Sequence, residues 1–308
     1  MKRISKLNKE FSALGFGGAS ISGEGRGYGF GDISESKAEE LLLLSYEHGV
    51  NIFDFAPIYG FNLAEIRAGR GLKKVREKVH LISKSGVDWH DNGRVNMSND
   101  PKIAIKMLNQ SLKNFNCDYI DIYLIHWPDS NVDIRRPLEA LYNEKEKGKI
   151  LHLGLCNTNI EDLRKAKEVC PVEVLQMEAN LFRQQTFKEL DQECDESILK
   201  LGWGTYDKGI LSGSVRADSK FDSSDCRSWA PWWKKSDWKD KVQFVDGVCS
   251  KMDINYAELA NFALNTSQQI VDVSLCGMKT QKQLLSNLEN LNTPCKGVEE
   301  VADEFTAY

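Results

Sequence analysis

The feature that most constrains this chain is a regular alternation of short apolar runs with longer amphipathic stretches. The apolar runs lie at residues 13–17, 50–54, 79–84, 119–126, 150–156, 172–178, 201–206 and 271–276. Helical patterns lie between them, including 36–48, 102–114, 137–147, 160–168 and 281–291. This alternation is typical of a parallel sheet with helical crossovers, and strands that are apolar throughout are buried on both faces.

The number of apolar runs decides between the possible architectures. Eight strands and about eight helices in strict alternation predict an α/β protein built as a (β/α)₈ TIM barrel, although an open doubly wound sheet gives the same alternation. No linker rich in Pro or Gly divides the 308 residues, so we expect one domain over residues 1–308. Residues 2–10 are expected to form a short β-hairpin that caps the barrel.

Composition excludes several classes of function. The chain has 40 Lys and Arg against 45 Asp and Glu, a net charge of −5, and no basic cluster, so we expect no nucleic-acid partner. No apolar run is long enough to span a membrane, and no signal peptide is visible. The eight cysteines form no CxxC pair and the five histidines show no metal-ligand spacing. We therefore expect a reduced, cytoplasmic protein without a metal site.

Polar residues stand at the ends of three apolar runs, where barrels carry out catalysis. Asp54 ends the second run, Lys84 the third and His126 the fourth, and Tyr59 follows Asp54 by five residues. Singly, these residues have structural explanations, as a strand cap, a surface lysine and a core histidine. Together at one mouth they indicate an active site.

The chemistry that these side chains suggest is protonation of a carbonyl oxygen. A tyrosine has an ordinary pKa near 10, and a neighbouring ammonium lowers that pKa by favouring the phenolate. A buried lysine stays charged only when a carboxylate pairs with it. Tyr59 is therefore the candidate general acid, with Lys84 and Asp54 tuning it and His126 orienting the substrate.

The same residues stand in motifs that resemble those of the aldo-keto reductase superfamily, over essentially the whole chain. The motif Asp-x-Ala-x-x-Tyr-Gly appears at residues 54–60, and His-Trp-Pro-Asp at residues 126–129. Lys84 stands at the position of the family's strand-three lysine. The resemblance implies a (β/α)₈ barrel that reduces a carbonyl with Tyr59 as general acid, and a small-molecule aldehyde, ketone or sugar as the substrate.

The resemblance also implies NADPH or NADP⁺ as the cofactor. Asn157 and Gln176 would bind the nicotinamide carboxamide, Trp203 would stack on the ring, and residues 208–213 would cover the pyrophosphate. Lys279, at the start of a helix near Thr280, supplies a cation for the 2′-phosphate and so favours NADPH over NADH. The implied cofactor-binding residues are Gly18, Ala19, Asp54, Cys156, Asn157, Gln176, Trp203, Gly209, Leu211, Gly213, Gly277, Lys279, Thr280, Gln283 and Asn287. Cys156 replaces a serine of the family's motif.

Two segments interrupt the regular pattern. Residues 18–31 are rich in glycine without GxGxxG spacing, which favours a flexible loop. Residues 214–240 form a polar insertion with four tryptophans. Candidate substrate-binding residues are Trp89, Trp127, Trp232 and Trp233, with Arg227 and Lys234 near enough to hold an anionic end. The alternative is that the indoles of the insertion only pack.

Three alternatives to carbonyl reduction stay open. The barrel could oxidise an aldose in the NADP⁺ direction, or serve as a cofactor-binding regulatory subunit with very slow turnover. An aldolase with a Schiff base on Lys84 is the third, but it gives Tyr59 no role. The sequence indicates neither the substrate nor the oligomeric state.

Overall fold

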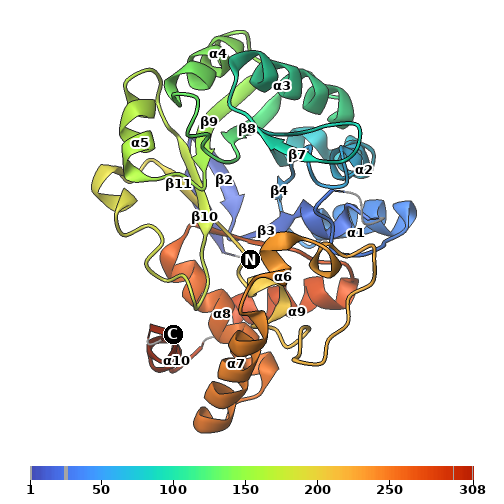
Figure 1. Ribbon diagram of the computed structural model, residues 1–308, viewed down its shortest axis with the longest axis vertical. Coiled ribbons are helices and arrows are strands. Elements are labelled where there is room, and N and C mark those ends of the chain that lie inside the picture. Colours follow the sequence, from blue (N-terminus) through green and yellow to red (C-terminus); the bar gives the residue numbers. More distant parts are fainter. Residues whose placement is uncertain (1, 24–26, 294, 307) are drawn as a thin grey trace.

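A closed barrel of eight parallel strands forms the centre of the molecule, and helices surround it (Figure 1). The computed structural model describes residues 2–23, 27–293, 295–306 and 308. Around the barrel the strands are β3 (Leu14–Gly17), β4 (Ile52–Asp54), β5 (His80–Ser85), β8 (Ile120–Ile125), β9 (Ile150–Cys156), β10 (Val174–Glu178), β11 (Leu199–Trp203) and β12 (Val273–Cys276). Every neighbouring pair is parallel, which confirms the predicted (β/α)₈ barrel.

The strands are apolar throughout because both of their faces are buried. Inward-facing side chains such as Ile52, Ile82 and Ile122 form one cluster in the barrel, while their neighbours Phe53 and Tyr123 pack outward in the larger core beneath the helices. Alternate residues of a strand point to opposite faces, so a continuous apolar run supplies both layers.

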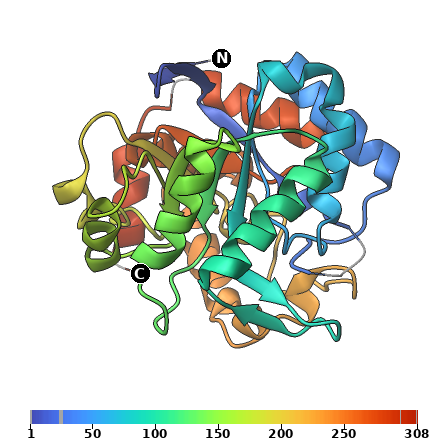
Figure 2. The same ribbon diagram turned by 90° about the horizontal axis from the view of Figure 1, so that it is seen from above.

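A β-hairpin covers one end of the barrel, as expected from residues 2–10. It consists of β1 (Arg3–Lys6) and β2 (Lys9–Ser12), so it extends two residues further than predicted. Leu7 and Asn8 both have positive φ, the conformation that a two-residue hairpin turn requires. Phe11 is buried against the interior cluster, and Figure 2 shows this hairpin at the end opposite to a second one.

The helices follow the predicted pattern over most of the chain. They are α1 (Glu35–Glu47), α2 (Leu63–Gly71), α3 (Pro101–Phe115), α4 (Arg135–Glu146), α5 (Ile160–Lys167), α6 (Pro231–Lys234), α7 (Trp238–Met252), α8 (Tyr256–Ile270), α9 (Gln281–Asn292) and α10 (Val298–Thr306). Short 3₁₀ helices are η1 (Gly18–Ile21), η2 (Lys73–Lys78), η3 (Leu190–Glu193), η4 (Asp207–Gly209) and η5 (Cys226–Ser228). Among the described residues no helix is long and apolar enough to cross a membrane.

The prediction of strict alternation is wrong between β10 and β11. Residues 179–198, all described, contain only the 3₁₀ helix η3 and turns. Leu181 is buried in a different cluster from Phe187 and Leu190, so the segment has no single apolar stripe with which to pack a helix on the barrel.

The segments after β5 and β11 are more ordered than expected. A second hairpin, β6 (Val87–Trp89) paired with β7 (Val95–Met97), follows β5. The tryptophan-rich insertion contains α6 and the start of α7, and these pack with α8 and α10 around a second apolar core. Figure 2 shows the β6–β7 hairpin and the segment around α6 at the same end of the molecule.

Candidate active site

Neighbouring strands bring Asp54 and Lys84 together at the carboxyl end of the barrel. Asp54 is the last residue of β4 and pairs in register with Ile82 of β5, so Lys84 lies two residues further on the same face. The Lys84 ammonium donates to Asp54 Oδ1 at 2.5 Å and to the Phe55 carbonyl at 2.8 Å. Both side chains are buried.

Burial and the ion pair with Asp54 change the pKa of Lys84 in opposite directions. Desolvation lowers the pKa of Lys84, but the Asp54 carboxylate raises it, and the net pKa is above the ordinary value. Lys84 is therefore an ammonium at neutral pH, and Asp54 is what allows a charged lysine to remain inside the protein.

Tyr59 lies above this pair, in the loop that follows β4. Its N–H donates to the Ala56 carbonyl at 3.0 Å, and Lys84 Nζ is 5.4 Å from the centroid of its ring. Burial raises the pKa of Tyr59 to about 12, and the Lys84 ammonium only partly opposes that rise. The Lys84 ammonium lowers the pKa of Tyr59, as expected, but desolvation outweighs the positive charge, so the net pKa is raised. At neutral pH the phenol is protonated.

His126 follows β8 directly and faces Tyr59 edge to face, with ring centroids 6.0 Å apart. Burial, with the Lys84 charge acting in the same direction, holds the pKa of His126 well below its usual range. A neutral imidazole beside the phenol can donate a hydrogen bond to an oxygen without carrying charge into the site. The structure thus brings all four predicted side chains to one place.

A chain of amide contacts connects these residues to the ends of β9 and β10. The Gln176 amide donates to Asp54 Oδ1 at 3.0 Å, and the Cys156 thiol donates to Gln176 Oε1 at 3.1 Å. Asn157, which has a φ of 52°, donates to the His126 carbonyl at 3.0 Å and accepts from the Trp203 indole at 3.0 Å. Two carboxamides beside an aromatic ring both donate and accept, which suits the carboxamide of a nicotinamide.

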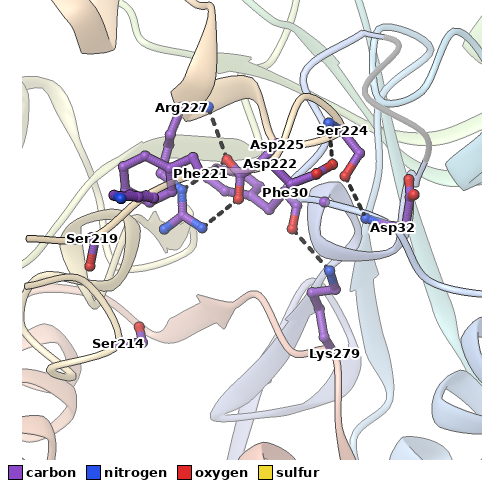
Figure 3. Close-up of a pocket in the computed structure, with 12 residues that line it drawn as sticks. Phe30, Asp32, Ser214, Ser219, Phe221, Asp222, Ser224, Asp225, Arg227 and Lys279 are labelled. Carbon is purple, nitrogen blue, oxygen red and sulfur yellow. Dashed lines mark hydrogen bonds and ion pairs between the residues drawn. The ribbon is translucent and has the colours of Figure 1, made fainter.

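A cavity of about 550 Å³ lies next to Lys279, between the loops that follow β3 and β11 (Figure 3). Lys279 Nζ donates to the Phe30 carbonyl at 3.0 Å, and burial lowers the pKa of Lys279. Thr280 caps α9, its hydroxyl accepting from Gln283 N. Gln283 itself accepts from Lys279 N at 2.7 Å, and the buried Asn287 accepts from the Tyr206 hydroxyl at 2.8 Å. A cavity lined by a cation beside a helix N-terminus fits a phosphate group.

Most of the other predicted cofactor-binding residues can contact a ligand only through their main-chain atoms. Gly209 and Gly213 have φ of 104° and 69°, values that favour glycine. The Leu211 side chain is fully buried in the second core, so only its backbone is available to a ligand. A Cβ on Gly18 would lie 2.1 Å from the Phe55 ring, so Gly18 is required by packing beneath the site. Ala19 is partly buried in η1, and a Cβ on Gly277 would meet Ser20 at 3.3 Å.

The four predicted substrate tryptophans lie in different environments. Trp127 and Trp232 are 38% and 40% exposed, and Trp89 lies 5.0 Å from the Phe61 ring, centroid to centroid. Trp233 is 3% exposed and stacks on Trp238 at 5.3 Å in the second core. Trp233 thus packs in the core, as the alternative interpretation of the insertion allowed.

Sequence reasoning missed Tyr28, and the structure places Arg227 at the cavity beside Lys279. Tyr28 lies 5.5 Å from Trp229 and 6.5 Å from Trp232, centroid to centroid, and it packs in the same cluster as Tyr59. The alternation Gly27-Tyr28-Gly29-Phe30 was the available signal, because it places two large aromatic side chains in a glycine-rich loop. Arg227, expected to be near enough to hold an anionic end of the substrate, lines the cavity that contains Lys279.

Comparison with known proteins shows that this chain is similar to several proteins named as reductases. Aldo-keto reductase YhdN of Bacillus subtilis is 29% identical over 287 residues, which are 91% of this chain and 85% of that protein. Aldo-keto reductase yakc [NADP(+)] of Schizosaccharomyces pombe is 26% identical over 248 residues, 78% and 72% of the two chains. The NADH-specific methylglyoxal reductase of Escherichia coli is 24% identical over 281 residues, 85% of each.

Solved structures show the same fold. A glycerol dehydrogenase from Gluconobacter oxydans superposes with a TM-score of 0.76 at 24% identity, covering 99% of this chain and 94% of that one. The holo form of an aldo-keto reductase from Bacillus halodurans gives 0.78 at 18% identity, covering 100% and 96%. The family model matches residues 13–303, and the chain therefore belongs to the Aldo/keto reductase family, whose members are nicotinamide-dependent oxidoreductases that act on small-molecule carbonyls.

Proposed function

We propose that this protein reduces the carbonyl of a small-molecule aldehyde, ketone or sugar with NADPH, and that Tyr59 is the general acid. The observation that carries the proposal is the stacked arrangement of a protonated phenol, a buried ammonium and its carboxylate. Lys84 Nζ lies 2.5 Å from Asp54 Oδ1 and 5.4 Å from the Tyr59 ring centroid.

The proton transfer follows from these contacts. Reduced nicotinamide supplies the hydride that carbonyl reduction requires. Tyr59 gives its phenolic proton to the carbonyl oxygen, and the Lys84 ammonium stabilises the phenolate that remains. Asp54 keeps Lys84 charged, and neutral His126 donates a hydrogen bond to the same oxygen. A pKa of Tyr59 of about 12 keeps the acid form available at neutral pH.

The choice of NADPH rests on Lys279. Names of relatives include one marked NADP(+) and one marked NADH-specific, so they do not decide between the two cofactors. Lys279 places an ammonium in the cavity beside the N-terminus of α9. The Asn157 and Gln176 amides would hold the nicotinamide carboxamide against Trp203. The backbone at Gly209 and Gly213 would hold the pyrophosphate, and Gln283 and Asn287 the adenine.

A spectrophotometric screen tests the proposal. Oxidation of NADPH is followed with simple aldehydes, ketones and keto-sugars, and reduction of NADP⁺ with aldoses is followed in parallel. We expect turnover in the NADPH direction with an aldehyde or ketone. Turnover confined to aldoses with NADP⁺ would make the protein a sugar dehydrogenase, and tight NADPH binding without turnover would make it a regulatory subunit.

Replacing Lys279 tests the cofactor preference. Lys279→Ala should weaken NADPH binding by roughly 1.5–3 kcal/mol, the contribution of a charged hydrogen bond, and should leave NADH binding unchanged because NADH lacks the 2′-phosphate. Lys282→Ala, which removes a cation from the exposed first turn of α9, is the matched control. Titration of protein fluorescence measures both affinities. Equal losses for both cofactors would show that Lys279 does not recognise the phosphate.

A further inference from the structure

Glu65 is a buried carboxylate that the proposed proton transfer does not use. It lies in the first turn of α2, the helix that begins four residues after Tyr59, and it is 0% exposed. Burial raises the pKa of Glu65, while hydrogen bonds from Ser83 and Asn114 act in the opposite direction. Because a carboxyl group is costly to bury unless its oxygens have partners, those partners indicate what Glu65 does.

The two oxygens of Glu65 accept hydrogen bonds from two other elements. Ser83 of β5 donates to Oε1 at 2.5 Å, and Asn114 in the last turn of α3 donates to Oε2 at 2.7 Å. Ser83 Oγ also lies 3.2 Å from Ser111 Oγ of α3. The helices α2 and α3 lie side by side (Figure 1). Glu65 therefore joins α2 both to a barrel strand and to the neighbouring helix, through buried hydrogen bonds.

The β5 partner of Glu65 is the residue next to Lys84. Successive side chains of a strand point to opposite faces, so Ser83 faces the helices while Lys84 faces Asp54. The backbone of Ser83 is fixed by the parallel pairing of β5 with β8, in which it lies opposite Tyr123. A hydrogen bond to Ser83 is therefore a connection to the segment that carries the Lys84 ammonium.

The other end of this connection leads to Tyr59. The Tyr59 carbonyl accepts from the N–H of Ala64, the second residue of α2, at 3.2 Å. Between them, residues 60–62 have φ of 65°, 48° and 80°, and the two that are not glycine are strained in this left-handed region. Asn114 also donates to Asn62 Oδ1 at 3.0 Å. The same buried contacts thus support the turn that carries the phenol.

We infer that Glu65 is a positioning residue, which holds the Tyr59 phenol at a fixed distance from the Lys84 ammonium. The inference rests on the proposed function, because it explains how the general acid named there is kept in place. Lys84 Nζ lies 5.4 Å from the Tyr59 ring centroid, but the two residues belong to a loop and to a strand that this loop does not adjoin in sequence. A misplacement of about 1 Å between reacting groups can lower a rate on the order of 10²-fold.

The connection depends on hydrogen bonds rather than on charge. In Glu65→Gln, the amide nitrogen can donate to Ser83 Oγ and the amide oxygen can accept from Asn114, because a hydroxyl both donates and accepts. In Glu65→Leu, a side chain of similar size forms neither bond. Ser83 would then keep Ser111 as its partner, and Asn114 would keep Asn62. The leucine variant therefore breaks the connection without leaving either partner alone in the core.

Steady-state kinetics in H₂O and in D₂O test the inference, with the best substrate from the NADPH screen. Glu65→Leu should lower kcat by roughly 10- to 100-fold. It should also increase the solvent isotope effect on kcat, because proton transfer from a displaced phenol becomes the slow step. Glu65→Gln should restore most of kcat. A fluorescence titration should give the wild-type NADPH affinity for both variants, since Glu65 has no contact with the residues assigned to the cofactor.

Two serine variants supply a smaller change and its matched control. Ser83→Ala removes only the donor to Glu65 Oε1 and should lower kcat by roughly 3- to 10-fold, with the same increase in the solvent isotope effect. Ser267→Ala removes a comparable hydrogen bond, because buried Ser267 of α8 lies 2.7 Å from Ser274 of β12, a strand that is not adjacent to β4 or β5. Its kcat and isotope effect should equal those of the wild type.

Three results would overturn the inference. The first is a normal kcat in Glu65→Leu and Ser83→Ala; Ser83→Ala alone decides this if the leucine variant does not fold. The second is a loss of kcat that vanishes after correction for the folded fraction, with an unchanged isotope effect, which would show a purely structural role. The third is a Glu65→Gln variant as impaired as Glu65→Leu, which would show that the charge is required.

These results are distinguishable from a failure of the proposed function. In each of the three cases Tyr59→Phe would still lose carbonyl reduction, so the proposed function would stand without the role given to Glu65. Near-normal carbonyl reduction by Tyr59→Phe would instead overturn the proposed function, and the inference about Glu65 with it.

Discussion

The candidate site has two parts, each containing a buried or half-buried ion pair. We call the part around Asp54 and Lys84 the strand half, and the part around Asp225 and Arg227 the loop half. Asp54 and Lys84 come from adjacent barrel strands, in fixed register, and the pair is buried. Asp225 and Arg227 come from one loop, two residues apart, and border a cavity. In the proposed function the strand pair positions the proton donor Tyr59, whereas the loop pair places a guanidinium at the cavity that contains Lys279.

The difference shows which part of the site tolerates variation. The register of β4 and β5 fixes the distance between Asp54 and Lys84, and a one-residue slip would turn one of them away from the site. The position of Arg227 depends on aromatic packing and turns in two loops, so its geometry is not fixed by the register of two paired strands. We therefore expect substitutions in the strand half to change catalysis steeply, and those in the loop half to change affinity or stability.

Tyr59→Phe gives the largest expected effect and tests the strand half. If Tyr59 donates the proton, kcat should fall by roughly 10²- to 10⁴-fold, the range for a positioned general acid. NADPH affinity should hardly change, because the phenol hydroxyl is the only group removed. Steady-state kinetics with the best substrate from the screen, together with a fluorescence titration of NADPH, measure both quantities. Near-normal carbonyl reduction by the variant would contradict the assignment.

The sequence predicted the strand half better than the loop half, for a physical reason. Asp54, Lys84 and His126 are polar residues at the ends of apolar strands, and the barrel brings such ends together. Their pairing could therefore be anticipated from spacing alone. The pKa of Tyr59 could not, because the balance between desolvation and the Lys84 charge depends on how deeply the loop is buried.

The sequence pattern could not predict how the loops pack. The four tryptophans of residues 214–240 look alike in sequence, yet Trp233 is buried and Trp232 is 40% exposed. Arg227 was expected near the substrate, and its actual neighbours Phe30 and Asp225 are brought to it by a contact between two loops. Contacts of this kind join segments nearly 200 residues apart and leave no periodic signal in either of them.

Substitutions of the adjacent residues Trp232 and Trp233 test which side chains of the loop half contribute to stability. Trp233→Ala should lower the free energy of unfolding by about 3–5 kcal/mol, because it removes a large buried ring from the second core. Trp232→Ala is the matched control, since its exposed ring should contribute little to stability. Denaturant unfolding measures both variants. If Trp232 instead contacts substrate, its replacement should raise KM while NADPH affinity stays constant. Equal destabilisation by the two substitutions would contradict this division.

The smallest expected effect is a pH dependence that arises from the strand half. Burial keeps the pKa of His126 well below the ordinary value, so the folded protein keeps this imidazole neutral on mild acidification. The unfolded chain binds a proton there as the pH falls through about 6.5. Since the unfolded state then binds more protons, stability must decrease with decreasing pH, by up to about 1.4 kcal/mol per pH unit for one group. Lys84 and Tyr59 stay protonated throughout this range and add no slope.

Comparing two histidine variants isolates this contribution. His126→Gln should show a shallower loss of unfolding free energy between about pH 7 and pH 5 than the wild type, because the variant has no imidazole to protonate on unfolding. His90→Gln, which removes a histidine from the exposed turn between β6 and β7, is the control and should keep the wild-type slope. Denaturant unfolding at a series of pH values gives the three slopes. If all three coincide, the His126 imidazole exchanges protons in the folded state as readily as in the unfolded chain. The Asp54–Lys84 part of the site would then be less shielded from water than its contacts indicate, and its contrast with the open cavity beside Lys279 would be smaller.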